Sequence, residues 1–149
     1  MAYYNGTFRS SYFQVENEEA YESLRHHLVA TDGVEFWDQE KGGAIYHAFG
    51  GYGCILGYVE DAKAYEEGES DEEPDFDRFA NELSKIVKEG DACVIMSAGH
   101  EKLRYVGGGV YVITKNHVES DSLVKCAAEI LKGHGVNPNS VYMDIIKIK

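Results

Sequence analysis

The chain has 149 residues, of which 26 are acidic and 14 are basic, so its formal net charge at pH 7 is -12. This length suits one domain, residues 1–149, and is enough for a hydrophobic core without disulfides or metals. The acidity disfavours direct binding to nucleic acid and to anionic membranes, which carry the same sign of charge, and it favours basic protein partners.

The cysteines and the N-terminus indicate where the protein resides. Cys54, Cys93 and Cys126 are widely spaced and form no CxxC pair, so the sequence predicts buried thiols in a reducing compartment. The first residues lack the basic and apolar regions of a signal peptide, and no stretch reaches the run of about 18 apolar residues that a membrane span needs. We therefore expect a cytoplasmic protein.

The first 59 residues predict a strand, a helix and three more strands. Residues 8–15 have strand-like apolar content, and Asn17 is a good helix N-cap. The apolar stripe of the helix continues through Leu28 and Val29, until Gly33 ends it. Further strands are predicted at 34–37, 44–49 and 54–59, with a turn at 41–43 and a glycine hairpin at 50–53.

The segment from 60 to 77, called the acidic segment below, is the most biased part of the chain. It holds ten acidic residues and one lysine, a local charge of -9, which is about three quarters of the formal net charge. Such a composition is typical of a solvated loop, which we expect over about 60–75.

The remaining residues predict two helices and three strands. Asp75 is a plausible N-cap for an amphipathic helix, and Ser120 or Asp121 for another. The predicted strands span 92–97, 103–114 and 142–148, and Gly107–Gly109 should interrupt the second of them. The resulting order, β-α-β-β-β-α-β-β-α-β, predicts an α+β fold with a single mainly antiparallel sheet and about three helices packed on one face.

No catalytic residue, metal ligand or cofactor is assigned from the sequence. The glycine run at 50–57 resembles a nucleotide-binding loop only superficially, because a strand follows it where a helix would be needed. The six histidines lack metal-ligand spacing, and the acidic segment does not match an EF-hand loop.

One short segment does collect polar groups of several kinds. His100, Glu101, Arg104 and Tyr105 offer a base, a carboxylate, a cation and a phenol where two predicted strands meet. Such a set can form a ligand-binding or active site, and a polar hairpin is the simpler alternative.

Two short motifs carry a resemblance to known proteins. YFQVENEEAY at 12–21 and GHEKLRY at 99–105 are similar to "YFxVxxxxAF/Y" and "GxEKLRY" patterns. These patterns occur in small uncharacterised accessory proteins of bacterial plasmids, phages and conjugative elements. The resemblance covers most of the chain but assigns no catalytic residue. It implies an accessory protein of a mobile element, and such proteins often counter host defences.

The leading hypothesis is therefore a non-enzymatic acidic inhibitor of the anti-CRISPR or antirestriction type. Its carboxylates would replace phosphates in a basic groove of a nucleic-acid-binding enzyme, a host defence nuclease. Two alternatives stay open: an immunity protein for a nuclease toxin, and a small ligand-binding domain or enzyme that uses the segment from His100 to Tyr105. A homo-oligomer is compatible with the sequence. The expected partner-binding residues are Glu66, Glu67, Glu69, Asp71, Glu72 and Glu73.

Overall fold

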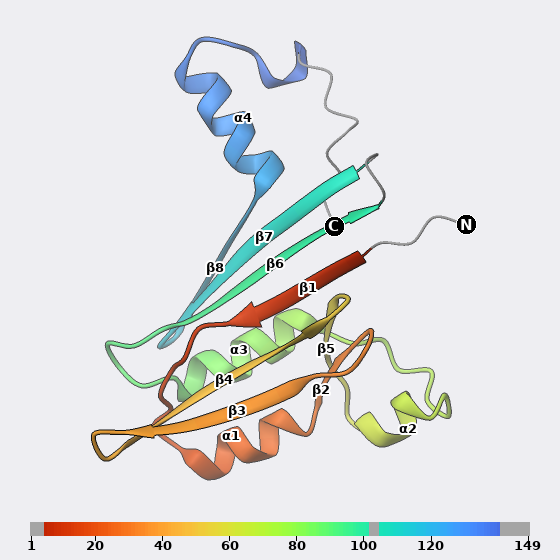
Figure 1. The fold of residues 1–149 in the computed structure, drawn as a ribbon, viewed down its shortest axis with the longest axis vertical. Coiled ribbons are helices and arrows are strands. Elements are labelled where there is room, and N and C mark those ends of the chain that lie inside the picture. Colours follow the sequence, from red (N-terminus) through yellow and green to blue (C-terminus); the bar gives the residue numbers. More distant parts are fainter. Residues whose placement is uncertain (1–4, 102–104, 141–149) are drawn as a thin grey trace.

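A six-stranded antiparallel sheet dominates the fold (Figure 1). The structure, a computed structural model, describes residues 5–101 and 105–140. The strand order is β3-β4-β1-β6-β7-β8, and every neighbouring pair is antiparallel. The predicted α+β class is confirmed. The strands are β1 (Asn5–Ser10), β3 (Glu35–Lys41), β4 (Ala44–Tyr52), β6 (Cys93–Glu101), β7 (Tyr105–Thr114) and β8 (His117–Ser122).

Two helices, α1 and α3, cover one face of this sheet and enclose the core with it (Figure 1). A third helix, α4, follows β8 directly and stands beyond the end of β7 and β8, and none of its residues is buried. No helix in the described part of the chain is long and apolar enough to cross a membrane. The helices are α1 (Glu18–Arg25), α2 (Ala62–Glu66), α3 (Phe76–Ile86), α4 (Leu123–Gly133) and a short 3-10 helix (Pro138–Ser140).

Phe49 lies at the centre of the core, where aromatic rings from the sheet and from α3 meet. Its ring centroid is 6.2 Å from that of Phe13, 6.1 Å from that of Phe36 and 5.8 Å from that of Phe79. The edge-to-face contacts with Phe13 and Phe79 add to the burial of apolar area. Of the cysteines predicted to be buried, Cys93 is buried, whereas Cys54 and Cys126 are half-buried.

A separate two-stranded sheet, β2 (Leu28–Ala30) with β5 (Ile55–Tyr58), corrects two predictions. Leu28 and Val29 do not continue α1, which ends at Arg25. Both side chains are buried, and their spacing from α1 fits a helix as well as a strand, so periodicity did not distinguish the two.

The predicted glycine hairpin at 50–53 is wrong as well. Gly50 and Gly51 belong to β4, opposite Arg9 and Phe8 of β1, and β5 pairs with β2 and not with β4. A β carbon on Gly51 would lie 2.5 Å from the carbonyl oxygen of Gly33. The glycine therefore serves close packing in a strand and not a turn.

Three smaller differences concern the strands. β1 ends at Ser10, and the predicted continuation to Val15 makes only isolated bridges, from Phe13 to His47 and from Val15 to Val87. The pairing of β7 with β6 runs unbroken through Gly107–Gly109, where an interruption was expected. β8 was not predicted, because its sequence HVESDS lacks apolar alternation, and Ser122 rather than Ser120 or Asp121 caps α4. The strand predicted at 142–148 lies outside the described residues.

Candidate functional site

The acidic segment contains a helix, α2, where only a loop was expected. Asp61 is its N-cap, and the Asp61 side chain accepts a hydrogen bond from the Ala64 N–H at 3.0 Å. After the last turn, the Glu69 N–H donates to the Ala64 carbonyl at 2.8 Å. A capping aspartate and hydrogen-bonded carbonyls at the C-terminal end stabilise even a short helix. The capping residue was present in the sequence, but the excess of acidic residues favoured a loop.

Hydrogen bonds tie the two ends of the acidic segment together. Tyr58 and Asp75 exchange two backbone hydrogen bonds, each of 3.0 Å. Both carboxylate oxygens of Glu72 accept from the Glu60 N–H, at 2.8 Å each. The Asp75 side chain also caps α3 by accepting from the Arg78 N–H at 3.0 Å. The segment therefore leaves the body of the protein and returns to it at one place, the neck formed by 58–60 and 72–75.

Arg78 reinforces the neck from the first turn of α3. Its guanidinium donates to the Glu60 carboxylate at 2.7 Å and lies 3.9 Å from the centroid of the Tyr58 ring. Tyr58 stacks on its other neighbour, His27, with ring centroids 4.5 Å apart. The ion pair with Glu60 and the cation–π contact with Tyr58 act together, so Arg78 links both sides of the neck.

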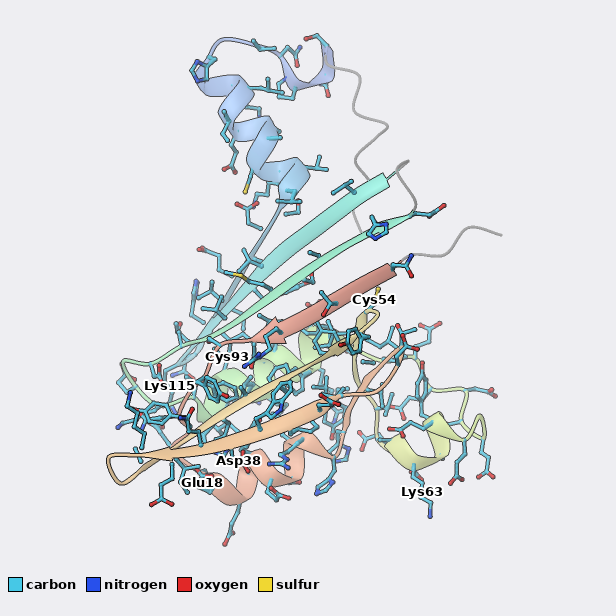
Figure 2. The ribbon with its side chains drawn as sticks, in the orientation of Figure 1. Glu18, Asp38, Cys54, Lys63, Cys93 and Lys115 are labelled. Atoms are coloured by element: carbon cyan, nitrogen blue, oxygen red, sulfur yellow. The ribbon has the colours of Figure 1, made fainter. Side chains whose placement is uncertain are left out.

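The acidic segment presents most of its predicted contact residues to solvent. Glu72 is half-buried and acts within the neck. No hydrogen bond or ion pair involves the other five carboxylates within the described residues. Lys63, the cation of the segment, points from α2 into solvent (Figure 2). The five exposed predicted residues are Glu66, Glu67, Glu69, Asp71 and Glu73.

His100 lies at a cavity of about 790 Å³ at the end of the six-stranded sheet. Asn5, Asp32 and Tyr52 line the same cavity, and 78% of Tyr52 is exposed. Of the other residues predicted for this site, Glu101 pairs with Tyr105 in the β6–β7 register. Arg104 and the side chain of Tyr105 lie outside the described part. His100 and the carboxylate of Asp32 thus line one cavity, and the sequence had not linked these two residues.

A smaller cavity of about 450 Å³ lies beside it, between the sheet and the start of α4. Its lining is mostly apolar and includes Met96, Val110 and Leu123. Cys126 also lines it, and its thiol donates to the Asp121 carboxylate at 3.2 Å. This hydrogen bond, together with partial burial, raises the pKa of Cys126 and so keeps the thiol protonated.

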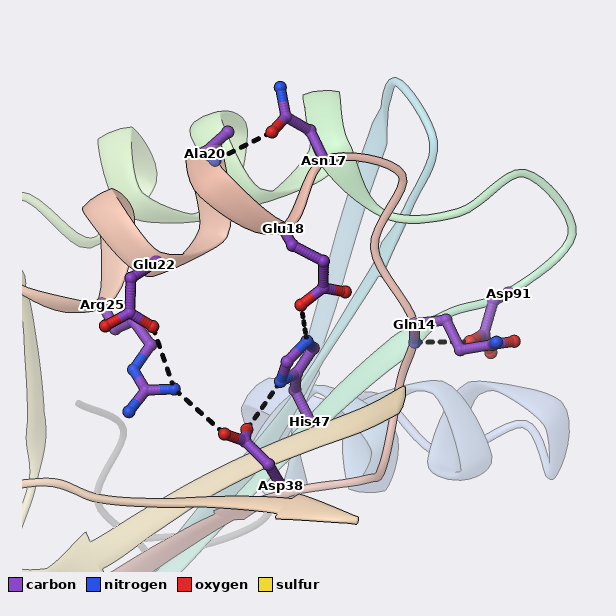
Figure 3. A network of polar contacts seen from close by, with 9 residues as sticks. All are labelled: Gln14, Asn17, Glu18, Ala20, Glu22, Arg25, Asp38, His47 and Asp91. Carbon is purple, nitrogen blue, oxygen red and sulfur yellow. Dashed lines mark hydrogen bonds and ion pairs between the residues drawn. The ribbon is translucent and has the colours of Figure 1, made fainter. Parts of the chain in front are cut away.

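A buried histidine lies between two carboxylates (Figure 3). The sequence did not predict this arrangement. His47 in β4 contacts Asp38 in β3 through Nδ1, at 2.7 Å, and Glu18 in α1 through Nε2, at 2.8 Å. No spacing rule brings these three residues together, because the contact depends on the β3–β4 register and on the position of α1. Among the residues that the structure describes, no group of three or more His, Cys, Asp and Glu side chains is arranged to hold a metal ion.

Comparison with protein-family models, with curated proteins and with solved structures finds no match to this chain. Its function must therefore be inferred from its own residues and from their arrangement.

Proposed function

We propose that this chain is a non-enzymatic inhibitor that binds the basic nucleic-acid groove of a host defence nuclease through its acidic segment. The observation that carries the proposal is the display of five exposed carboxylates on a segment held at its neck: Glu66, Glu67, Glu69, Asp71 and Glu73. Most acidic side chains on a protein surface are scattered, whereas these five lie within eight residues.

The physical basis is charge complementarity with little reorganisation. A nuclease groove carries lysines and arginines spaced for phosphates, and carboxylates offer the same charge-assisted acceptors. Because α2 and the neck already order the segment, fewer backbone conformations are lost when it binds. The local charge of -9 should also accelerate the encounter with a basic partner.

The proposal predicts a clear salt dependence. We expect the dissociation constant for a restriction or CRISPR nuclease to rise about tenfold between about 50 and 200 mM NaCl, because screening weakens steering and contact together. Binding is measured by calorimetry, and inhibition of DNA cleavage is followed in parallel. An affinity that does not change with salt would contradict an electrostatic interface. An immunity protein would show the same dependence, and a toxin gene beside its own gene would distinguish that case.

A second candidate function is the binding of a small molecule. The observation in its favour is the cavity of about 790 Å³ at His100, within the usual size range of ligand sites. Its rim exposes Tyr52 and Val106, and its polar groups include Asp32. A compound that raises the unfolding temperature of the wild type but not that of His100→Ala would support this candidate, and the acidic segment would then be a solvated loop.

A further inference from the structure

His47 is a buried titratable side chain that contacts two carboxylates at once. Only 3% of the residue is exposed, yet both ring nitrogens lie within 2.8 Å of a carboxylate oxygen (Figure 3). Asp38 sits directly across from His47 in the β3–β4 hairpin, and Glu18 is the first residue of α1. The ring therefore joins the first turn of a helix to a hairpin of the sheet.

The surroundings fix the ring in this position. The His47 backbone exchanges two hydrogen bonds with Phe13, of 2.8 and 2.9 Å. The Tyr21 ring lies 4.4 Å from the imidazole, between centroids. Burial raises the pKa of Tyr21, so the phenol stays uncharged beside the ring. The imidazole thus has little freedom to turn away from either carboxylate.

Charged groups surround the two carboxylates that hold the ring. The segment before α1 contributes the apolar ring of Phe13, 6.1 Å from the imidazole between centroids. Glu16 and Lys88 line a surface hollow together with Glu18. The Arg25 guanidinium lies 3.5 Å from Asp38 and also 3.5 Å from Glu22, so it supports the carboxylate on the far side from His47. On α1 and β3, the titratable or charged residues at the ring and its carboxylates are Glu18, Tyr21, Glu22, Arg25 and Asp38.

The two contacts differ in what they require of the ring's protons. A neutral imidazole has one N–H and can donate to one carboxylate only, and its other nitrogen would then direct a lone pair at the second carboxylate. With both carboxylates ionised, both contacts are attractive only if both nitrogens carry a proton. The carboxylates of Glu18 and Asp38 are each half exposed, so water reaches the outer side of both.

We propose that His47 is a pH-sensitive latch, in which the doubly protonated ring fastens the start of α1 to the β3–β4 hairpin. The latch holds while both ring nitrogens carry a proton and loosens as the pH rises and one proton leaves, because the deprotonated ring keeps only one of its two hydrogen bonds. The first turn of α1 then stays attached through Asn17, which caps the helix, and through the apolar packing of Tyr21.

The latch also has an acid limit, set by Asp38. Partial burial opposes the ionisation of Asp38, but the hydrogen bond and charge of His47, together with Arg25, hold the pKa of this carboxyl below its ordinary value. A depressed carboxyl pKa keeps Asp38 ionised until the pH falls below the usual range for aspartate, about 3.9. The latch should therefore be closed in mildly acidic solution.

The test is urea unfolding of the full chain from about pH 5.5 to pH 8.5, with His47→Gln beside the wild type. We expect the unfolding equilibrium constant of the wild type to rise about tenfold more over this range than that of His47→Gln, the effect of losing one buried charge-assisted hydrogen bond. His117→Gln is the matched control, because the exposed His117 ring also faces a carboxylate, that of Glu119, at 3.9 Å. The control should follow the wild type at every pH.

Two further measurements keep the proposal testable. If His47→Gln does not fold, Glu18→Gln replaces it: the half-exposed site tolerates the change, and the pH dependence should shrink by a similar factor. Nitrogen-15 spectra of the histidine rings should show both His47 nitrogens protonated near pH 5.5. Equal pH dependence in wild type and variants, or a singly protonated His47 ring at that pH, would overturn the latch.

Discussion

If the acidic segment binds a nuclease as proposed, replacing Glu66, Glu67, Glu69, Asp71 and Glu73 by their amides should weaken that binding about 100-fold. Each exposed carboxylate that meets a basic side chain contributes about 0.2–1 kcal/mol, so the loss of five amounts to about 3 kcal/mol. The fold should not change, because these side chains make no hydrogen bond or ion pair within the described residues. Calorimetric titration of the variant against the nuclease measures the effect.

The matched control removes five negative charges elsewhere. Each control residue is exposed, and none has a side-chain partner within the described residues. The dissociation constant of the control should lie within about threefold of the wild-type value. Charges that act only at long range contribute less to affinity than charges that contact the partner. Equal weakening in both variants would mean that net charge, and not the acidic segment, drives binding. The control changes are Glu19→Gln, Glu35→Gln, Glu40→Gln, Glu89→Gln and Glu129→Gln.

Gly57→Ala lowers the free energy of unfolding by about 3 kcal/mol or more. Gly57 in β5 has φ +134°, and a β carbon there would lie 2.4 Å from the Phe76 nitrogen and 2.5 Å from the Asp75 carbonyl carbon. These atoms belong to the start of α3, where the acidic segment rejoins the body of the protein. The substitution should therefore destabilise the fold and also displace the neck.

Gly68→Ala separates the two causes of this loss, which are backbone strain at a positive φ and the close approach of other atoms. Gly68 lies inside the acidic segment with φ +76°, and nothing lies within 4 Å of the position of a β carbon. Only backbone strain remains there, which costs about 1–2 kcal/mol. Urea unfolding measures both variants. An equal loss for both would show that the close approach at Gly57 does not matter.

The starts of α1 and α3 were the most predictable part of this fold. Asn17 and Asp75 each cap a helix that begins at the next residue, as their side chains predict. The apolar stripe of α3 is buried as its spacing implies, with Phe79, Ala80 and Leu83 in the core. Capping and amphipathic spacing are local properties, and so they can be recognised without the rest of the chain.

Strand partners were less predictable, because they depend on residues far apart in the sequence. Leu28 and Val29 satisfy a helical stripe, yet β5 supplies the partner that makes them a strand. The glycines of β4 are typical of a turn in the sequence, but in the structure Gly51 packs closely against the Phe8 ring. The candidate site was also predictable only in part. The acidic residues were evident from composition, whereas the hydrogen bonds of Glu72 in the neck depend on a distant residue, Glu60.

The proposed interface is between the acidic segment and a nucleic-acid groove. Its most direct test is competition, in which the labelled protein bound to the nuclease is titrated with the nucleic acid that the nuclease recognises. Mutual exclusion is expected, so that saturating nucleic acid releases the protein and the apparent dissociation constant rises in proportion to nucleic-acid concentration. A stable ternary complex, with both ligands bound at saturation, would contradict it.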